Sequence, residues 1–347
     1  MYGDDSTSII VEHNVLRETY IPDKLRARET QSEQILCCLS PVFKRRKPIH
    51  TWLHGKAGTG KTTTAIYALR RLEEKAPVKS LIINCWKKRT FYEILDEMIS
   101  EFRILRADEH RTSFKLEKIR SFFKDQPFVV VLDEVDQVRP RELSSVLYNL
   151  DSVLNAGIVC ISHSTGALTE LEERVRSRLN PHTIFFPCYS RQTLLEILTN
   201  RAELALAEGS WSHTALRTIA AMAQGDARAA IRMLRRAAIL VDHQRLDRIT
   251  TRTLEEQIKA AKDLRRTSIL NSLTQDHRMF YEIVEQKGKI LSGDLWQEYL
   301  QRCERLRRRP LAWRTFSDYC NRLVQTGLIT YERARVRGRV RLFKIVA

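Results

Sequence analysis

Gly55-Lys56-Ala57-Gly58-Thr59-Gly60-Lys61-Thr62 decides the fold of this 347-residue chain, because it matches the phosphate-binding pattern G-x-x-x-x-G-K-[ST] at every fixed position. A short apolar stretch at 49–54 precedes it and a helical pattern at 63–72 follows it. The glycines let backbone N–H groups surround a phosphate, and the helix N-terminus adds the positive end of a dipole. We therefore expect Lys61 to reach the β- and γ-phosphates of a nucleotide and Thr62 to hold Mg²⁺.

A second motif, Phe-Val-Val-Val-Leu-Asp-Glu, lies at 128–134. A β-branched apolar run that follows Pro127 is typical of a central strand in a parallel sheet. At the end of this strand, Asp133 is expected to bind Mg²⁺ through water, and Glu134 to polarise the attacking water as general base. A strand that ends in a solvated acidic turn would look the same in isolation. The phosphate-binding loop in the same chain favours the catalytic interpretation.

Five apolar segments in the first half of the chain are expected to be strands, and helical patterns alternate with them. These segments lie at 49–54, 80–84, 127–132, 157–162 and 183–187. Alternation of strands and helices predicts an α/β fold with a parallel sheet and helices on both faces. In such folds a nucleotide binds at the C-terminal ends of the strands.

The pattern changes after Pro187, because only helical periodicity continues to about residue 262. Beyond it, the expected order is three helices and then two strands that form a hairpin, which is typical of a winged helix. The helices are expected at about 267–287, 291–304 and 311–326, and the strands at 327–332 and 339–345. We therefore predict a nucleotide-binding domain over 1–188, an α-helical lid over 189–264 and a DNA-binding winged helix over 265–347.

Composition points to an intracellular protein that binds nucleic acid. The net charge is +17, and the last quarter of the chain holds about twice as many basic as acidic residues. A thermophile-like surface of paired charges would explain many of these residues, but not the excess of one sign. No apolar stretch is long enough to span a membrane, and the seven cysteines include no C-x-x-C pair. We expect a cytoplasmic, nucleoid-associated protein with reduced cysteines.

The order of motifs resembles that of AAA+ ATPases, and more narrowly that of the archaeal replication initiators related to the origin recognition complex and its cell-division-cycle partner. The resemblance covers nearly the whole chain. The segments that carry it are 20–29, the phosphate-binding loop, Leu-Asp-Glu-Val-Asp at 132–136, 174–179, Gly-Asp-Ala-Arg at 225–228, and 267–347. This resemblance implies an AAA+ sheet domain with a lid and a C-terminal winged helix.

The resemblance also implies roles for individual residues, with ATP or ADP and Mg²⁺ as cofactors. Arg228 would reach from the lid to the γ-phosphate, although a solvated arginine on a helix is the simpler alternative. Arg178 would act as an arginine finger toward a neighbouring subunit. The segment that packs on the adenine, and the loop residues beside the phosphates, would supply the remaining contacts: Tyr20, Ile21, Pro22, Arg28, the octapeptide from Gly55 to Thr62, and Thr63.

One position departs from the family pattern. The family commonly has Ile-Ser-Asn-Asp where this chain has Ile-Ser-His-Ser at 161–164, so His163 stands where a polar residue would orient the attacking water. A histidine can donate a hydrogen bond, but its charge varies near neutral pH. Slow hydrolysis, or hydrolysis only with a partner, is one expectation. A tolerated substitution with no catalytic role is the other.

DNA contacts are expected from two parts of the chain. In the winged helix they are the wing arginines and the start of the recognition helix, namely Arg333, Arg335, Arg337, Arg339, Arg341, Arg314 and Thr315, with the arginine run at 305–309 as a further candidate. In the sheet domain the long connection 91–124 offers Arg106, Arg111 and Lys115. A solvated arginine face is the alternative in each case.

The leading interpretation is an initiator that binds double-stranded origin DNA and helps to recruit or load the replicative minichromosome-maintenance helicase, together with paralogous initiator subunits. A nucleotide-gated transcription or plasmid-copy regulator would show the same motifs. A motor-type ATPase such as a clamp loader would not need a winged helix, which argues against that class. The site on DNA would separate the first two functions.

Overall fold

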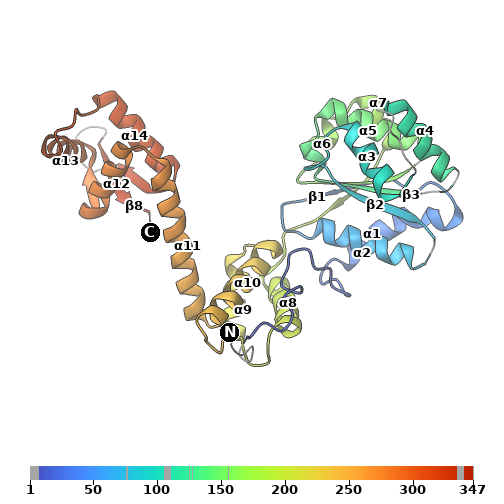
Figure 1. Cartoon of the computed structure of the whole chain (residues 1–347), viewed down its shortest axis with the longest axis horizontal. Coiled ribbons are helices and arrows are strands. Elements are labelled where there is room, and N and C mark those ends of the chain that lie inside the picture. The colour runs from blue at the N-terminus through green and yellow to red at the C-terminus, as the bar shows by residue number, and fades with distance from the viewer. Residues whose placement is uncertain are drawn as a thin grey trace, which may run out of the picture. The chain divides into compact units, whose positions relative to one another are not determined.

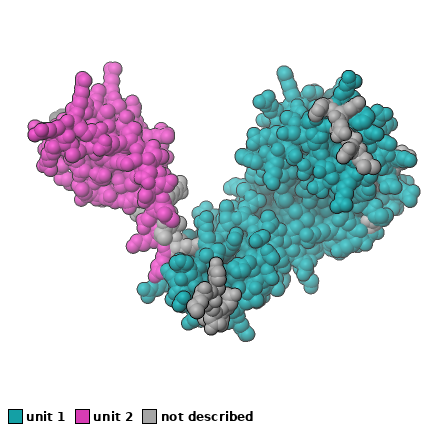
Figure 2. All heavy atoms as spheres, viewed as in Figure 1, with its two compact units in different colours: residues 1–254 teal, residues 255–347 magenta. Residues whose placement is uncertain are grey.

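The computed structural model describes residues 8–75, 77–104, 111–124, 126, 128–154, 156–333 and 340–346. The chain forms two compact units, residues 1–254 and residues 255–347 (Figure 2). The predicted wing residues Arg335, Arg337 and Arg339, and Arg106 of the long connection, lie outside the described residues. No helix of the described part is long and apolar enough to span a membrane.

The first unit contains the predicted parallel sheet, in the order β2-β3-β4-β1-β5. Its strands are β1 (Thr51–His54), β2 (Lys79–Asn84), β3 (Phe128–Asp133), β4 (Gly157–Ser162) and β5 (His182–Phe185). All four pairings are parallel. Every residue of β3 and β4 is buried, which explains why these central strands are continuously apolar rather than alternating.

Helices cover both faces of the sheet, as predicted (Figure 1). One face packs against α1 (Glu29–Leu39) and α2 (Lys61–Glu73), and the other against α3 (Phe91–Glu101) and α5 (Pro140–Ser152). The shorter helices of this unit are α4 (Thr112–Phe123), α6 (Gly166–Thr169) and α7 (Glu173–Leu179), with 3-10 turns η1 (Ser40–Lys44) and η2 (Val135–Gln137).

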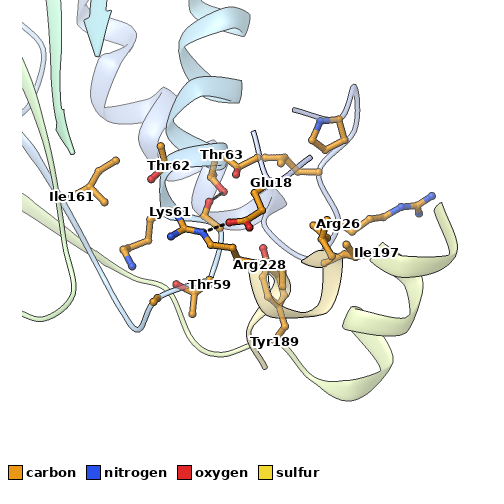
Figure 3. Close-up of a pocket in the computed structure, with 18 of the residues that line it drawn as sticks. Glu18, Arg26, Thr59, Lys61, Thr62, Thr63, Ile161, Tyr189, Ile197 and Arg228 are labelled. Carbon is orange, nitrogen blue, oxygen red and sulfur yellow. Dashed lines mark hydrogen bonds and ion pairs between the residues drawn. The ribbon is translucent and has the colours of Figure 1, made fainter. Parts of the chain in front are cut away.

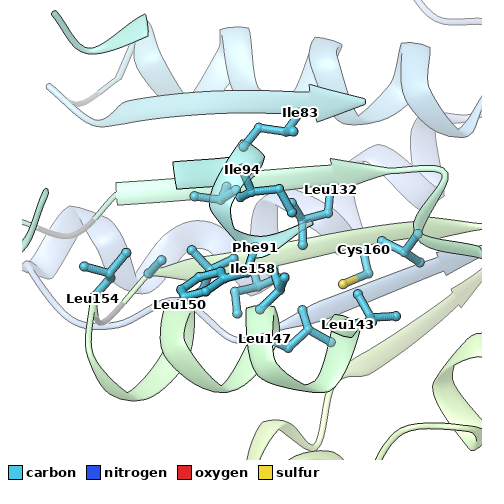
Figure 4. Close-up of a cluster of buried hydrophobic side chains, with 14 of the residues drawn as sticks. Ile83, Phe91, Ile94, Leu132, Leu143, Leu147, Leu150, Leu154, Ile158 and Cys160 are labelled. Carbon is cyan, nitrogen blue, oxygen red and sulfur yellow. The ribbon is translucent and has the colours of Figure 1, made fainter. Parts of the chain in front are cut away.

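Side chains of β3 alternate between the two cores, because successive strand residues point to opposite faces. Val131 joins the cluster under α1 and α2, whereas Leu132 joins the cluster under α3 and α5. In that second cluster Leu147 and Ile158 pack around Phe91 (Figure 4). The two cores hold the C-terminal end of β3 in a fixed position, where the predicted catalytic carboxylates lie.

The lid consists of α8 (Arg191–Ala205), α9 (His213–Met222) and α10 (Ala227–His243). Its core also contains residues from the N-terminus, among them Ile10 and Leu16. Arg201 of α8 fixes this segment, since it donates to the carbonyl oxygens of Val15 at 2.6 Å and Tyr20 at 3.0 Å. The structure therefore differs from the predicted division at residue 188: the N-terminal segment packs on the lid, although it was assigned to the sheet domain.

The second unit contains the expected winged-helix order with two differences. Its elements are α11 (Thr251–Ser272, which begins in the first unit), α12 (Gln275–Lys287), β6 (Lys289–Leu291), α13 (Ser292–Arg305), α14 (Trp313–Gln325), β7 (Ile329–Arg333) and β8 (Arg341–Ile345). The single helix expected over 267–287 is wrong, because Thr274 is extended (φ −66°, ψ 162°) and starts a new helix. A short strand, β6, joins the predicted hairpin as a third strand, in the order β6-β8-β7.

Candidate nucleotide site and nucleic-acid surface

The phosphate-binding loop connects β1 to α2, and α2 begins at Lys61. Gly58 and Gly60 have φ of 69° and 85°, which favours glycine at both positions. A Cβ on Gly60 would lie 2.3 Å from the hydroxyl oxygen of Tyr189, and one on Gly58 would overlap the carboxylate of Asp226. The glycines are therefore required by backbone conformation and by the close approach of the lid.

Lys61 is buried at the centre of this loop. Its ammonium Nζ donates to the carbonyl oxygens of Gly55 at 2.6 Å and Lys56 at 2.8 Å. Burial lowers the pKa of Lys61; the carboxylate of Asp133 opposes this shift, and the positive charge of Arg228 lowers the pKa further. A polyphosphate in the pocket would add negative charge beside this buried ammonium.

Thr62 and Asp133 form the candidate metal site. The Thr62 hydroxyl donates to Asp133 Oδ2 at 2.9 Å. Burial raises the pKa of Asp133, and this hydrogen bond partly offsets the shift. Hydroxyl and carboxylate oxygens are hard ligands that suit Mg²⁺, which takes few protein ligands and completes its shell with water and phosphate oxygens. The residues present therefore fit a nucleotide-bound Mg²⁺.

Two further predicted residues lie beside this pair, at the ends of β3 and β4. Glu134 begins the turn after β3 with left-handed backbone angles (φ 60°, ψ 46°), and it lines the pocket together with His163. The backbone N–H of His163 donates to Asp136 Oδ2 at 2.6 Å, which ties the two turns together. A carboxylate and an imidazole therefore line the same pocket as the phosphate-binding loop.

The lid closes the other side of the pocket. Asp226 caps α10 by accepting from the backbone N–H of Ala229 at 2.9 Å, and the N–H of Ala227 donates to the Gly58 carbonyl at 3.0 Å. These contacts place Arg228, in the first turn of α10, at the pocket wall. There its guanidinium Nε lies 3.4 Å from a carboxylate oxygen of Glu18 (Figure 3).

The structure brings together most, but not all, of the predicted nucleotide contacts. The predicted residues that line the pocket are Pro22, Ala57 to Thr63, Asp133, Glu134, His163 and Arg228. Tyr20, Ile21, Arg28, Gly55 and Lys56 are not among its lining residues.

Tyr20 and Arg28 brace the walls of the pocket. The Arg28 guanidinium is buried, donates to the Thr59 carbonyl at 2.9 Å, and lies 4.1 Å from the ring centre of Tyr189. The ring of Tyr20 stacks under the guanidinium of Arg201 at 4.3 Å.

Several lining residues were not named individually from the sequence, although Lys24, Leu25 and Arg26 fall within the segment 20–29 that was expected to pack on the adenine. These lining residues are Glu18, Lys24, Leu25, Arg26, Thr64, Ile161, Ser162, Tyr189, Ile197, Asn200, Arg201, Ala227 and Ile231. Among them Leu25, Ile197 and Ile231 are apolar, and an apolar lining suits the flat face of a base. The helical spacing of Ile197 and Arg201 places them one turn apart on α8. Nothing in that spacing indicates that this side of the helix faces the phosphate-binding loop.

Arg178 lies on α7 and is not among the residues that line the pocket. Its side chain is half exposed, and its Nε lies 2.5 Å from Asp151 Oδ2. The structure therefore does not place Arg178 beside the candidate nucleotide site of its own chain.

The residues predicted to contact nucleic acid differ in their exposure. Arg314 is exposed and Thr315 half-buried in the first turn of α14, and Arg333 is exposed at the end of β7. Arg341 stacks on Tyr331 at 4.9 Å. Arg111 is exposed where α4 begins.

Lys115 was wrongly predicted to face DNA. It is 2% exposed, pairs with Asp96, and lies 3.4 Å from the ring centre of Tyr92. The helix α4 turns this lysine toward α3, so it is not available to a phosphate backbone.

Sequence models of three protein families match successive parts of the chain. An AAA domain matches residues 45–167, a Cdc6 AAA+ ATPase-type lid domain matches 195–263, and the CDC6 C-terminal winged-helix domain matches 280–347. ORC1-type DNA replication protein 2 of Thermoplasma acidophilum is 28% identical over 96% of this chain and 88% of its own length. The ORC1-type DNA replication protein of Pyrococcus furiosus is 29% identical over 92% and 83%.

Solved structures agree with this relationship. The structure of the Aeropyrum pernix ORC1 protein in complex with DNA is 26% identical to this chain, with a TM-score of 0.68. The match covers 98% of this chain and 94% of that one.

Proposed function

Because the chain belongs to the AAA+ family of ORC1-type and Cdc6 replication proteins, we propose that it is an ATP-dependent initiator that binds double-stranded origin DNA. The observation that carries the proposal is the joint placement of Lys61, the Thr62–Asp133 pair and Arg228 around one pocket, in a chain that also contains a winged helix. These features support a single polypeptide that combines nucleotide binding with DNA binding.

In this proposal the lid contacts the phosphates of the nucleotide through Arg228. Lys61 and Arg228 both contact the phosphates, and Thr62 and Asp133 hold Mg²⁺. The metal ion, when bound, neutralises charge on the phosphate oxygens. Glu134 orients and polarises the attacking water, and His163 sets how well it is oriented. Hydrolysis is slow and serves as a switch, because it changes what the lid contacts rather than driving a motor.

The proposed partners are DNA, a paralogous initiator subunit and the replicative helicase. Arg314, Thr315 and the wing arginines contact DNA, with Arg111 as a further contact from the sheet domain. Half-exposed Arg178 acts as a finger on the nucleotide of a paralogous initiator subunit. The assembly on origin DNA then helps to recruit or load the minichromosome-maintenance helicase. Its place of action is the nucleoid.

Footprinting of the purified chain on genomic DNA, with and without ATP and Mg²⁺, tests this proposal. We expect protection of repeated elements at an origin, and loss of nucleotide dependence in Lys61→Ala. Lys75→Ala, at an exposed lysine just after the C-terminal end of α2, is the matched control and should behave as the parent. Protection confined to a promoter operator would instead indicate a transcription or plasmid-copy regulator.

A further inference from the structure

Glu18 is an acidic residue that lines the pocket in which the phosphates are expected. It belongs to the N-terminal strap, which we define as residues 8–20. The strap packs on the lid through buried residues such as Ile10 and Leu16 and through the bonds from Arg201. Glu18 lines the nucleotide pocket at the end of this strap (Figure 3). Its position is therefore set by the lid.

The carboxylate of Glu18 lies between two arginines of α10. Its Oε2 lies 3.4 Å from Nε of Arg228, and its Oε1 lies 3.4 Å from Nε of Arg232. The two arginines are four residues apart and so project from the same face of the helix. One carboxylate therefore holds two guanidinium groups, and each oxygen serves one of them.

A phosphate would compete for the same donors. Guanidinium groups bind carboxylate and phosphate oxygens by the same charge-assisted hydrogen bonds. Arg228 is also near enough to Lys61 for its charge to affect that ammonium, so it lies within reach of the phosphate end of the pocket. Asp133 and Glu134, which also line the pocket, come from the C-terminal end of β3, where the metal and the water are expected. Glu18 is the acidic lining residue on the lid side.

We propose that Glu18 is a specificity-determining residue that stands in for the γ-phosphate and so sets the preference of the pocket for ATP over ADP. The proposal rests on the proposed nucleotide site. With ADP bound, Arg228 and Arg232 keep Glu18 as their partner. ATP brings a γ-phosphate that displaces the Glu18 carboxylate from Arg228. The binding free energy gained from the phosphate contact is therefore reduced by the loss of the Glu18–Arg228 ion pair. Glu18 belongs to the strap, and the strap packs on the lid. The exchange of Glu18 for the γ-phosphate at Arg228 therefore changes the contacts between the strap and the lid.

The size of the effect follows from the exposure of the pair. The side chains of Arg228 and Glu18 are 49% and 35% exposed, so each ion pair is screened by solvent and salt. Glu18→Gln should therefore raise affinity for a triphosphate by about 2- to 10-fold, and change ADP affinity by less than about 2-fold. The difference should shrink at high salt, because surface electrostatics are screened.

Calorimetric titration of the full chain with ADP and with the β,γ-imido analogue of ATP, each with Mg²⁺, tests the proposal. The variants are Glu18→Gln, Arg228→Ala/Arg232→Ala, and the combination of all three. Glu12→Gln, an exposed glutamate of the same strap, is the matched control. We expect Glu18→Gln to increase the triphosphate-to-diphosphate affinity ratio, Glu12→Gln to leave it unchanged, and Glu18→Gln to add nothing once both arginines are removed.

An unchanged ratio in Glu18→Gln, or weaker binding of the triphosphate analogue, would overturn the proposal. Weaker binding would mean that Glu18 positions Arg228 for the phosphate instead of competing with it. Lys61→Ala separates this failure from a failure of the site itself. If Lys61→Ala binds both nucleotides as well as the parent, the nucleotide site is wrong. If Lys61→Ala loses binding while Glu18→Gln leaves the ratio unchanged, only the role of Glu18 is wrong.

Discussion

Asp151 and Arg178 form an ion pair in which the guanidinium Nε lies 2.5 Å from the carboxylate Oδ2. Asp151 is buried near the end of α5, and it also bonds His50 Nε2 at 2.8 Å and the Lys47 ammonium. Burial alone would raise the pKa of Asp151, but the hydrogen bonds from His50, Lys47 and Arg178 hold it well below its ordinary value. The candidate finger is thus anchored to the residues that lead into β1.

Asp151→Asn should destabilise the first unit and reduce its sensitivity to acid. A carboxylate whose pKa is depressed by folding contributes stability above its unfolded pKa of about 3.9, and this contribution is lost as the pH falls through the folded pKa. We expect a loss of about 1–3 kcal/mol in the free energy of unfolding at pH 7, because charge-assisted hydrogen bonds are removed. Urea unfolding at pH 3 to 8 measures this.

Asp247→Asn is the matched control for that prediction, since Asp247 is exposed. It should unfold as the parent does at every pH. If the free energy of unfolding of Asp151→Asn changes with pH in parallel with that of the parent between pH 3 and 8, the ion pairs and hydrogen bonds of Asp151 contribute no acid-dependent stability.

Asp133→Asn should increase the stability of the nucleotide-free protein and abolish its hydrolytic activity. Burial raises the pKa of Asp133, so the folded protein binds this proton more tightly than the unfolded chain does, and stability falls as the pH rises through that range. At neutral pH the buried charge therefore costs stability when no metal is bound. We expect Asp133→Asn to raise Tm by a few degrees without nucleotide and to abolish hydrolysis. Calorimetry without Mg²⁺ and a phosphate-release assay measure the two effects, and an unchanged or lower Tm would contradict the first.

Part of this site could be predicted from local sequence, and part could not. Lys61, Thr62 and Asp133 follow from short motifs, because glycine spacing and an apolar strand that ends in carboxylates are local features. Glu18 and the burial of Lys115 depend on which helix a segment packs against. Single-sequence periodicity does not specify that partner.

The same limit explains the differences in the fold. The strands of the sheet are recognisable because their apolar residues are consecutive. The N-terminal strap has apolar residues that fit a sheet or a lid equally well, and tertiary packing decides between them. The break at Thr274 was missed because helical spacing continues on both sides of the two-residue gap between Ser272 and Gln275.

His163→Asn should increase the rate of ATP hydrolysis if this position orients the attacking water. The parent is expected to turn over well below the common enzyme median of about 10 s⁻¹. The backbone of His163 is fixed by Asp136, so the substitution changes the side chain without moving the turn. Single-turnover hydrolysis with saturating ATP and Mg²⁺ measures the effect, with Glu134→Gln as the inactive reference. An unchanged rate would show that the histidine is a neutral substitution.

Arg314→Ala should reduce recognition of the specific DNA site more than general DNA affinity. Arg314 is exposed in the first turn of α14, where side chains of a recognition helix meet base edges in the major groove. A lost bidentate contact to a base should cost about 1–3 kcal/mol on the specific site and much less on random duplex DNA. Titrations on both DNAs at several salt concentrations measure this difference.

Two further variants make the DNA prediction specific. Arg302→Ala is the matched control, because the Arg302 guanidinium is already paired with Glu282 and its loss should leave both affinities unchanged. Arg333→Ala, at the exposed end of β7, should lower the affinity for the specific site and for random duplex DNA equally. It should also reduce the slope of log affinity against log salt by about 0.9, as expected for one lost phosphate contact. If Arg314→Ala lowers the affinity for both DNAs equally and leaves the ratio of the two affinities unchanged, α14 contacts the DNA backbone and the bases are recognised by another part of the protein.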